Sequence, residues 1–217
     1  MQNLKLKNKK LQVSCDGGAA TGKSTGAKMI SRKYNLKFLS SGLLYRYAGY
    51  LLINNKVKNK VSFLEKRFKK LNFNKLNAIN LHTQDISETS ARIAKQNKIR
   101  KILKKYQLSF IKKNQNCCIE GRDISTNIMP KSNVKFFFIC NLDIASKRRF
   151  RELKKNNSDL KLADVKKALR IRNKSDIKRK NSPLLKHRDS VVIDTGKLSK
   201  QAMLTKMSKY VERIIKK

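Results

Sequence analysis

The 217-residue sequence contains no tryptophan, only two prolines and eight glycines, and 14 acidic residues against 54 lysines and arginines. So little proline and glycine argues against a collagen-like or low-complexity chain. The length suits one α/β domain with a sizeable core and a small insert, but not two full domains. No uninterrupted apolar run approaches the roughly 20 residues that span a bilayer, so we expect a soluble protein with no membrane partner.

Cysteine and histidine are also scarce, at four and two residues. The cysteines show no CxxC spacing and no histidine stands near them, which argues against metal ligation. Three of the four lie in or at the end of apolar, strand-like runs, where a reduced cysteine behaves as a small buried hydrophobe. We therefore expect a reducing, cytoplasmic location, and the basic start of the chain lacks the apolar segment of a secretory signal.

The formal net charge is +40, which taken alone suggests a nucleic-acid or anionic-membrane partner. The lysines are spread through nearly every segment together with many asparagines, as in "LKLKNKK" and "NNKVKNK". This dispersed pattern favours a solvated basic surface over a dedicated nucleic-acid site. We expect nucleic-acid binding, if any, to be non-specific, while polyanionic substrates would still be attracted.

Five short apolar runs predict strands: Leu11 to Cys15, "KFLS" ending at Ser40, "CCIEGRD", "VKFFFIC" and "SVVIDT". Continuous apolar strands suit a parallel sheet covered on both faces. Helical patterns follow the strands, at about 23–34, from Ser41 onward, 85–114, 143–155 and 162–180. A last amphipathic helix is expected after Ser199 as its cap. The chain is therefore predicted to be an α/β protein with a five-stranded parallel sheet flanked by helices.

A glycine-rich loop follows the first predicted strand and opens the first predicted helix. Gly17-x4-Gly22-Lys23-Ser24 satisfies the G-x-x-x-x-G-K-[ST] pattern, in which backbone N–H groups surround a phosphate. Lys23 would reach the β and γ phosphates of ATP, and the Ser24 hydroxyl would bind Mg²⁺. The predicted ATP-binding residues, called the phosphate loop below, are Gly17, Gly18, Ala19, Ala20, Thr21, Gly22, Lys23, Ser24 and Thr25.

Two other features bear on the class of phosphate-loop protein. Asn173-Lys174-Ser175-Asp176 matches the N-K-x-D string that reads guanine in GTPases, but it follows no apolar strand and no D-x-x-G follows the loop. We interpret this match as coincidence. Arg172, Asp176 and Arg179 are spaced i, i+4 and i+7, which fits equally a surface salt-bridge ladder and a face that binds a phosphorylated substrate.

Six segments decide between these interpretations: "VSCDGGAATGKST", "FLSSGLLYR", "IEGRDIST", "ASKRRFREL", "RNKSDIKRKNSPL" and "VVIDTGKLS". In this order they resemble the motif series of bacterial cytidylate kinases, members of the nucleoside monophosphate kinase group. The resemblance implies a kinase core at 1–53 and 92–217, a lid near 154–162, and a nucleotide-binding insert, shorter than the family's usual one, at 54–91. It also implies transfer of the γ-phosphoryl group of Mg-ATP to CMP or dCMP by a monomer.

The resemblance also assigns roles to residues. It implies that Ser41, Arg46, Arg122 and Arg179 hold the acceptor phosphate, that Asp123 and Arg100 read the base, and that Arg172 and Asp176 contact the ribose. A carboxylate suits cytosine because it accepts a hydrogen bond from the exocyclic amino group. Arg148 is expected near the transferring phosphates. Catalysis would rest on Lys23, Arg122, Arg148, Arg179 and Mg²⁺ without a general base.

The sequence departs from the family pattern at three positions. Gly18 stands where proline is common, Ser125 replaces the second glycine of G-R-D-I-G-T, and Ala91, with Ser90 beside it, falls where the family has a serine thought to assist base recognition. Two alternatives stay open. One is another nucleoside monophosphate kinase, such as a UMP/CMP kinase, and the other is a basic phosphate-loop ATPase that binds RNA.

Overall fold

The structure is a computed structural model that describes residues 10–154 and 159–216. The chain divides into two compact units, and each is described by itself. The first unit runs up to Ser40 and resumes at Asn114, and the second is Ser41–Lys113. The predicted insert at 54–91 lies within the second unit, and its role stays a prediction. Of the predicted lid at 154–162, residues 155–158 lie outside the described residues.

The first unit is built on a five-stranded, wholly parallel sheet, which confirms the predicted fold class. Its strand order is β2-β3-β1-β4-β5. The strands are β1 (Gln12–Gly17), β2 (Lys37–Ser40), β3 (Cys117–Gly121), β4 (Val134–Ile139) and β5 (Val191–Asp194). The central strand β1 is buried along its whole length, as its apolar run predicts for a strand covered on both faces.

Helices α1 (Lys23–Lys33) and α8 (Lys200–Lys216) share one hydrophobic core with β1 and β4. Ile30, Phe136, Met207 and Val211 are buried in it. The Oγ atom of Ser199 accepts a hydrogen bond from the N–H of Ala202 at 3.1 Å, so the predicted cap of α8 is present. This core fixes the start of α1, and therefore the phosphate loop, relative to the sheet.

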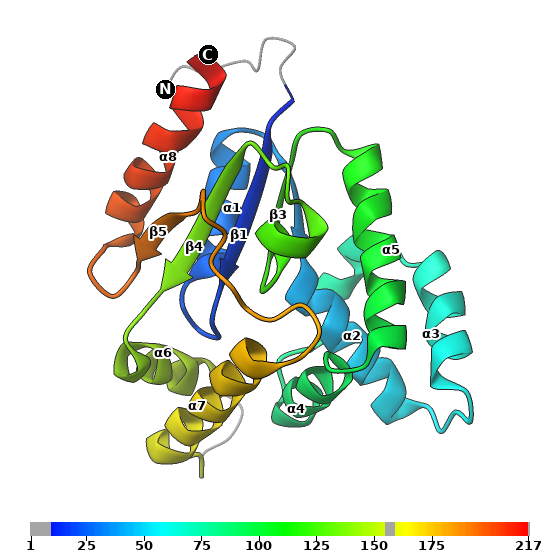
Figure 1. Cartoon of the computed structure of the whole chain (residues 1–217). Helices are drawn as coiled ribbons and strands as arrows, with labels where there is room; N and C mark the ends of the chain where they lie inside the picture. Colours follow the sequence, from blue (N-terminus) through cyan, green and yellow to red (C-terminus); the bar gives the residue numbers. More distant parts are fainter. Residues whose placement is uncertain (1–9, 155–158, 217) are drawn as a thin grey trace. The chain divides into compact units, whose positions relative to one another are not determined.

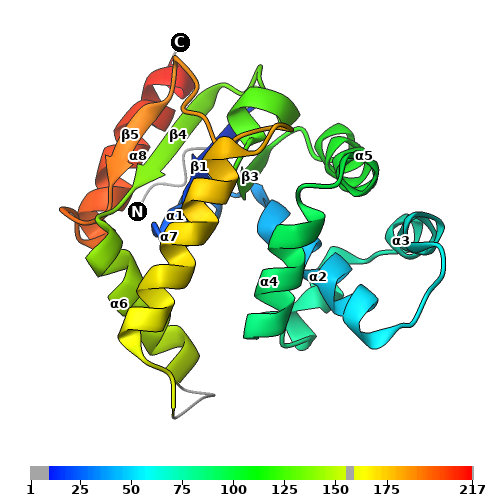
Figure 2. The ribbon, with the colours of Figure 1, turned by 60° about the horizontal axis from the view of Figure 1, so that its bottom comes forward.

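Helices α6 (Leu142–Lys154) and α7 (Leu162–Lys178) lie at the end of the sheet where β1 and β4 end (Figure 1). They pack side by side, as Figure 2 shows from below. A second apolar cluster joins Ala145, Val165 and Leu169 of these helices to Ala19 of the phosphate loop. In open α/β sheets, ligands bind at the carboxyl ends of the strands, so α6 and α7 stand where a nucleotide site is expected.

The second unit is helical, with α2 (Ser41–Asn54), α3 (Lys60–Lys69), the 3₁₀ turn η1 (Phe73–Ala78), α4 (Gln84–Ile93) and α5 (Asn97–Lys113). The weakly periodic stretch after Asn54 thus contains a helix, which the side chain of Asn59 caps by accepting from the N–H of Ser62. Buried Leu64 and Phe68 anchor this helix within the unit.

The single helix predicted at about 85–114 is wrong, because the structure has two helices there. The N–H of Gln96 donates to the carbonyl oxygen of Ile93 at 2.9 Å, which tightens the last turn of α4 and ends it. The carbonyl oxygen of Ala94, left outside the helix, accepts instead from the side chain of Arg100 at 3.1 Å.

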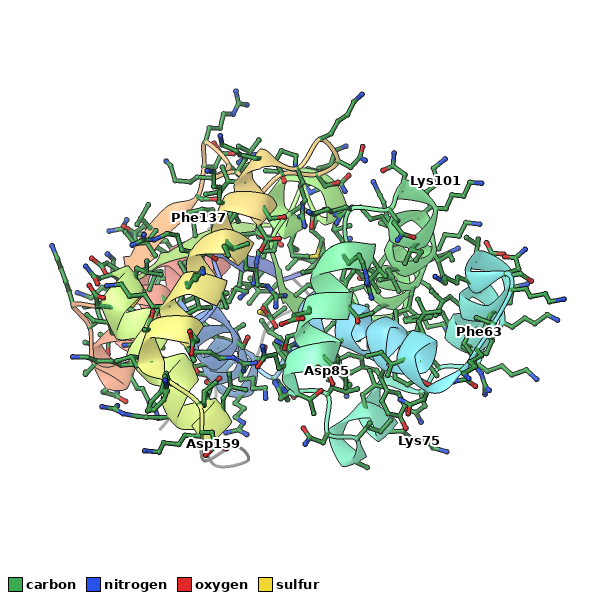
Figure 3. The ribbon with its side chains drawn as sticks, turned by 90° about the horizontal axis from the view of Figure 1, so that it is seen from below. Phe63, Lys75, Asp85, Lys101, Phe137 and Asp159 are labelled. Carbon is green, nitrogen blue, oxygen red and sulfur yellow. The ribbon has the colours of Figure 1, made fainter. Side chains whose placement is uncertain are left out.

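The charge is distributed as its sequence pattern predicts. Side chains tipped with nitrogen project from both units in Figure 3. Every helix among the described residues is too short or too polar to span a lipid bilayer.

Candidate active site

The phosphate loop joins β1 to α1, and its shape depends on glycine. A Cβ atom on Gly17 would lie 2.5 Å from the carbonyl oxygen of Phe138 in β4, too close for any side chain. Gly22 has a φ of 78°, a left-handed conformation that glycine adopts without strain. Ala20 also has a positive φ, 56°. These left-handed residues curl the backbone so that successive N–H groups can face one anion.

The side chain of Lys23 turns back over the phosphate loop. Its Nζ atom donates to the carbonyl oxygen of Gly18 at 3.1 Å and lies 3.8 Å from Oε2 of Glu120. Burial and the nearby charge of Arg122 lower the pKa of Lys23 to about 7, against the opposing effect of Glu120. Arg172 acts in the same direction as Arg122. The charges of Arg122 and Arg172 thus both act on Lys23, and an excess of cationic groups of this kind favours a polyanionic ligand.

Glu120 is a site residue that the motif comparison does not single out. It ends the apolar run of β3, is 3% exposed, and accepts a hydrogen bond from the hydroxyl of Ser40. Its Oε2 atom is shielded from solvent and has no hydrogen-bond partner among the described residues. The sequence feature that could have identified Glu120 is its position as a carboxylate near the carboxyl end of a buried strand.

The oxygen donors near the phosphate loop suit Mg²⁺ carried by a nucleotide. Within the part of the chain that the structure describes, no group of three or more His, Cys, Asp or Glu side chains could hold a metal ion. Ser24 is exposed in the first turn of α1, and Glu120 offers the buried Oε2 atom. Mg²⁺ commonly keeps water and phosphate ligands and takes few from the protein, so these two donors fit.

Arg148 of α6 is connected to the phosphate loop through Thr195, which follows β5. Its Nη1 and Nη2 atoms donate to the hydroxyl and the carbonyl oxygen of Thr195 at 2.9 and 2.8 Å. The same hydroxyl donates to the carbonyl oxygen of Thr21 at 2.8 Å. Sequence motifs assign Thr195 no role, because its two partners lie far away along the chain.

Helix α7 contacts the phosphate loop through Asn173. The Oδ1 atom of Asn173 accepts from the N–H of Ala19 at 2.9 Å. A Cβ atom on Gly18 would lie 3.1 Å from the same Oδ1 atom. Gly18, where the family commonly has proline, thus leaves room for this amide. The first residue of the N-K-x-D string therefore supports the phosphate loop.

Four of the charged residues expected to bind the acceptor form one network. Arg122 donates through Nε to Oδ2 of Asp176 at 2.8 Å. Arg179 donates through Nη1 to Oδ1 of Asp176 at 3.3 Å, and its Nη2 lies 3.7 Å from Oδ1 of Asp123. Burial acts to raise the pKa of Asp176, but Arg122 and the other arginines hold it below its usual range. Two arginines are thereby held in place by carboxylates.

The expected helical position of Arg179 is wrong, although Arg179 does contact Asp176. Helix α7 ends at Lys178, and Arg179 follows as its C-cap with extended backbone angles. The helix stops here because the carbonyl oxygen of Asp176 accepts from the N–H of Leu184 at 2.8 Å. Arg172 stays within α7, where burial lowers its pKa to about 10 and its Nε atom has no hydrogen-bond partner among the described residues.

Ser41 and Arg46 belong to the second unit. Ser41 is the buried first residue of α2. Arg46 donates through Nη1 to the carbonyl oxygen of Leu81 at 3.0 Å and to the hydroxyl of Ser87 at 2.8 Å. These two bonds fix the guanidinium group through its Nη1 atom, so the Arg46 side chain has a defined orientation on α2.

Arg100 is also in the second unit, at the start of α5. Besides its bond to Ala94, its guanidinium lies over the ring of Tyr45, 5.5 Å from the centroid. Ser90, beside the position of the family's serine, is buried and donates to the carbonyl oxygen of Ser87 at 2.7 Å. The structure thus gives Ser90 a local role within α4.

A family model described as cytidylate kinase matches residues 13–213. The chain belongs to the cytidylate kinase family. It is 33% identical to a cytidylate kinase of Bartonella tribocorum, covering 94% of this chain and 95% of that one. It is 31% identical to a cytidylate kinase of Rickettsia canadensis, covering 99% and 100%. The family predicted from the six motifs is therefore confirmed, and the chain is a kinase.

Solved structures share the fold of this kinase. An uncharacterised protein of Eubacterium ventriosum superposes with a TM-score of 0.52 at 16% identity, covering 94% of this chain and 99% of that one. A Thermus thermophilus protein gives a TM-score of 0.51 at 14% identity, covering 94% and 96%. At these identities the likeness concerns the fold alone.

Proposed function

We propose that this kinase transfers the γ-phosphoryl group of Mg-ATP to CMP or dCMP, giving CDP or dCDP. The observation that carries the proposal is the contact of Lys23 with the carbonyl oxygen of Gly18 in the phosphate loop. The same unit contains the network in which Asp176 holds Arg122 and Arg179. Cations gathered in this way suit a reaction that brings two polyanions together. The relatives from Bartonella tribocorum and Rickettsia canadensis, both named cytidylate kinase, support the choice of acceptor.

The donor half of the site is the phosphate loop. Its backbone N–H groups and the amino end of α1 hold the phosphates of ATP, and Lys23 exchanges its contact with Gly18 for the β and γ phosphates. Ser24 and Glu120 are the side chains that would hold Mg²⁺, directly or through water. When bound, Mg²⁺ neutralises charge on the β and γ phosphates.

The acceptor half uses the charged network. In the first unit, Arg122 and Arg179 contact the acceptor phosphate, Arg172 and Asp176 contact the ribose, and Asp123 reads the cytosine amino group. In the second unit, Ser41 and Arg46 keep the phosphate-binding role, and Arg100 the base-reading role, that the family resemblance gives them. In support, Asn127 donates to Oδ2 of Asp123 at 3.0 Å, so this carboxylate has a fixed orientation.

The chemical step needs no base, because the acceptor phosphate oxygen is already a competent nucleophile. It forms a bond to the γ-phosphorus of ATP while the bond to the β–γ bridging oxygen breaks, and ADP leaves. Lys23, Arg122, Arg148 and Arg179 neutralise the charge that develops. Closure of a lid near 154–162 would exclude water during transfer.

We further propose that the kinase acts as a cytoplasmic monomer. In support of a cytoplasmic location, its four cysteines are free thiols, as is usual for proteins in a reducing compartment. Sedimentation of the purified protein at several concentrations tests the monomer, and a mass that rises toward twice 25.1 kDa would contradict it.

A substrate panel tests the reaction. Purified protein is incubated with Mg-ATP and CMP, dCMP, UMP or AMP, and ADP and the new diphosphate are measured. CMP and dCMP should be turned over with higher kcat/KM than UMP or AMP. No ADP above background with any pyrimidine nucleotide would refute the proposal, and UMP turned over as well as CMP would favour a UMP/CMP kinase.

A variant pair tests the base-reading role. Asp123→Ala should reduce the ratio of CMP to UMP turnover while changing the KM for ATP little. Asp189→Ala removes an exposed carboxylate outside the network and should leave both unchanged. An unaltered preference in Asp123→Ala would remove this residue from the assignment.

A further inference from the structure

Asp16 is a buried carboxylate that no step of the proposed reaction uses. It lies in the central strand β1, directly before Gly17, and is 0% exposed. Its neighbour in β3 is Gly121, which directly precedes Arg122. The carboxylate thus lies between Gly17, the first residue of the phosphate loop, and the segment that carries Arg122 and Asp123.

Three hydrogen bonds join Asp16 to that segment. Its Oδ1 atom accepts from the N–H of Ile124 at 2.8 Å, and its Oδ2 atom accepts from the N–H of Ser125 at 2.7 Å. The hydroxyl of Ser125 donates to the same Oδ2 atom at 2.6 Å. Ile124 and Ser125 begin the short π-helical turn η2 (Ile124–Ile128), whose first N–H groups have no partner within the turn. Asp16, which belongs to strand β1, therefore caps the amino end of the turn η2.

Ser125 supplies a donor that the family pattern lacks. The family's glycine at this position offers only a backbone N–H, whereas the hydroxyl of Ser125 adds a third, short bond to Asp16. Ser125 is itself 0% exposed, so this bond is shielded from solvent. A buried carboxylate depends on such donors to stay charged.

The turn that Asp16 caps also orients the acceptor-binding residues. Asp123 is the N-cap of η2, and its carbonyl oxygen accepts from the N–H of Asn127 at 2.9 Å. A shift of η2 would therefore move Asp123 directly, and Arg122 one residue earlier.

We propose that Asp16 and Ser125 form a positioning pair, which holds Arg122 and Asp123 next to the first residue of the phosphate loop through the three hydrogen bonds that Asp16 accepts. The pair rests on the proposed function for the roles of Arg122 and Asp123. It links the donor half of the site to the acceptor-binding segment through one buried carboxylate.

The charges around Asp16 give the pair a measurable signature. Burial raises the pKa of Asp16 to about 6, and the hydrogen bond from the Ser125 side chain is the largest effect that opposes this rise. Asp123 raises the pKa slightly, and Cys15 precedes Asp16 in β1. The residues paired with Asp16 in β3 and β4, Gly121 and Phe137, do not titrate. Losing the hydroxyl should therefore raise the pKa further, toward neutral pH.

Carbon NMR of the side-chain carboxyl groups tests the charge without using activity. The Asp16 resonance is identified by its absence from Asp16→Asn, and it is titrated in the wild type, in Ser125→Ala and in Ser31→Ala. Ser31 is the matched control, because its buried hydroxyl donates to Ala27 within α1. The titration midpoint should rise by about one pH unit in Ser125→Ala alone. An unchanged midpoint, or an equal rise in Ser31→Ala, overturns the proposal.

Steady-state kinetics test the positioning. In Ser125→Ala the acidic limb of the kcat/KM profile should move to higher pH, and the KM for the acceptor should rise more than the KM for ATP. Asp16→Asn should lower kcat/KM at every pH and lose this limb. If the NMR midpoint moves while the profile and KM values match those of Ser31→Ala, the pair does not position the site.

Failure of the two proposals can be told apart. A wild type that phosphorylates no pyrimidine nucleotide refutes the proposed function, whatever Asp16 does. A wild type that phosphorylates CMP, with Ser125→Ala unchanged in midpoint and profile, refutes the positioning pair alone.

Discussion

Arg148 and Thr195 are joined by two hydrogen bonds, one to the hydroxyl and one to the carbonyl oxygen of the threonine. Because the hydroxyl also donates to Thr21, it carries a connection from α6 to the phosphate loop. An arginine expected near the transferring phosphates is thus oriented by the loop that we propose holds the donor.

Replacing Thr195 with valine tests this connection. Valine keeps the shape but loses the hydroxyl, so Arg148 loses one of its two bonds to residue 195 while its contact with the Sγ atom of Cys140 remains, and Thr21 loses its donor. We expect kcat to fall about tenfold, equivalent to about 1.4 kcal/mol of transition-state stabilisation. Thr195→Ser keeps the hydroxyl and should retain most of the rate. Equal rates in the two variants would show that the hydroxyl does not orient Arg148.

Gly18 and Asn173 should behave as one unit. In Gly18→Ala the new Cβ would lie 3.1 Å from Oδ1 of Asn173, so we expect the amide to shift and its bond to Ala19 to weaken or break. We expect the KM for ATP to rise about fivefold, as for the loss of one hydrogen bond. Asn173→Ala should have a similar effect.

The double variant is the decisive measurement for this pair. Since both single changes affect the same bond, the double variant should be no worse than either. Lys174→Ala, an exposed neighbour on α7, provides the control. Independent, multiplying effects would contradict the link between α7 and the phosphate loop.

The features predicted correctly from sequence are local. The glycine-rich turn between β1 and α1 needs only one short run of residues, although its binding of ATP stays a prediction. Each of the five strands is a single apolar run bounded by polar residues. Ser199 caps α8 through a residue three positions away. Short-range chemistry of this kind can be read directly from the order of residues.

The features missed depend on contacts between distant segments. Thr195 meets Thr21 across 174 positions, and Asn173 meets Ala19 across 154. The periodicity of the sequence predicts a helix that includes both Asp176 and Arg179. In the structure the N–H of Leu184 binds the carbonyl oxygen of Asp176, and the helix ends before Arg179. Such contacts require knowledge of which elements are neighbours in the fold.

Asp176 should stabilise the fold through its arginines. Asp176→Asn leaves Arg122 and Arg179 without their carboxylate, so the free energy of unfolding near neutral pH should fall by about 3 kcal/mol. Because the pKa of Asp176 is lowered in the folded state, its contribution is present above the unfolded pKa of about 3.9 and is lost as the pH falls further.

Urea denaturation at several pH values measures this contribution. The difference between wild type and Asp176→Asn should be constant from about pH 5 to 8 and shrink below about pH 4. Asp189→Asn, an exposed carboxylate, should differ little from wild type throughout. A difference that grew on acidification would contradict the lowered pKa.

ATP binding should draw a proton onto Lys23. With a pKa of about 7, this amine is mostly charged at pH 6 and mostly neutral at pH 8. The phosphates of ATP stabilise the charged form, so binding should take up a proton at pH 8, and this uptake should fade toward pH 6. Calorimetry in two buffers with different ionisation enthalpies measures it.

Lys23→Arg is the informative variant for that measurement, because its guanidinium stays charged at every pH used. This variant binds ATP with a permanent cation, so the extra uptake at pH 8 should be absent. Lys33→Met changes a half-exposed lysine at the far end of α1 and should retain the wild-type uptake. Uptake of the same size in Lys23→Arg would assign the proton to another group and contradict the lowered pKa of Lys23.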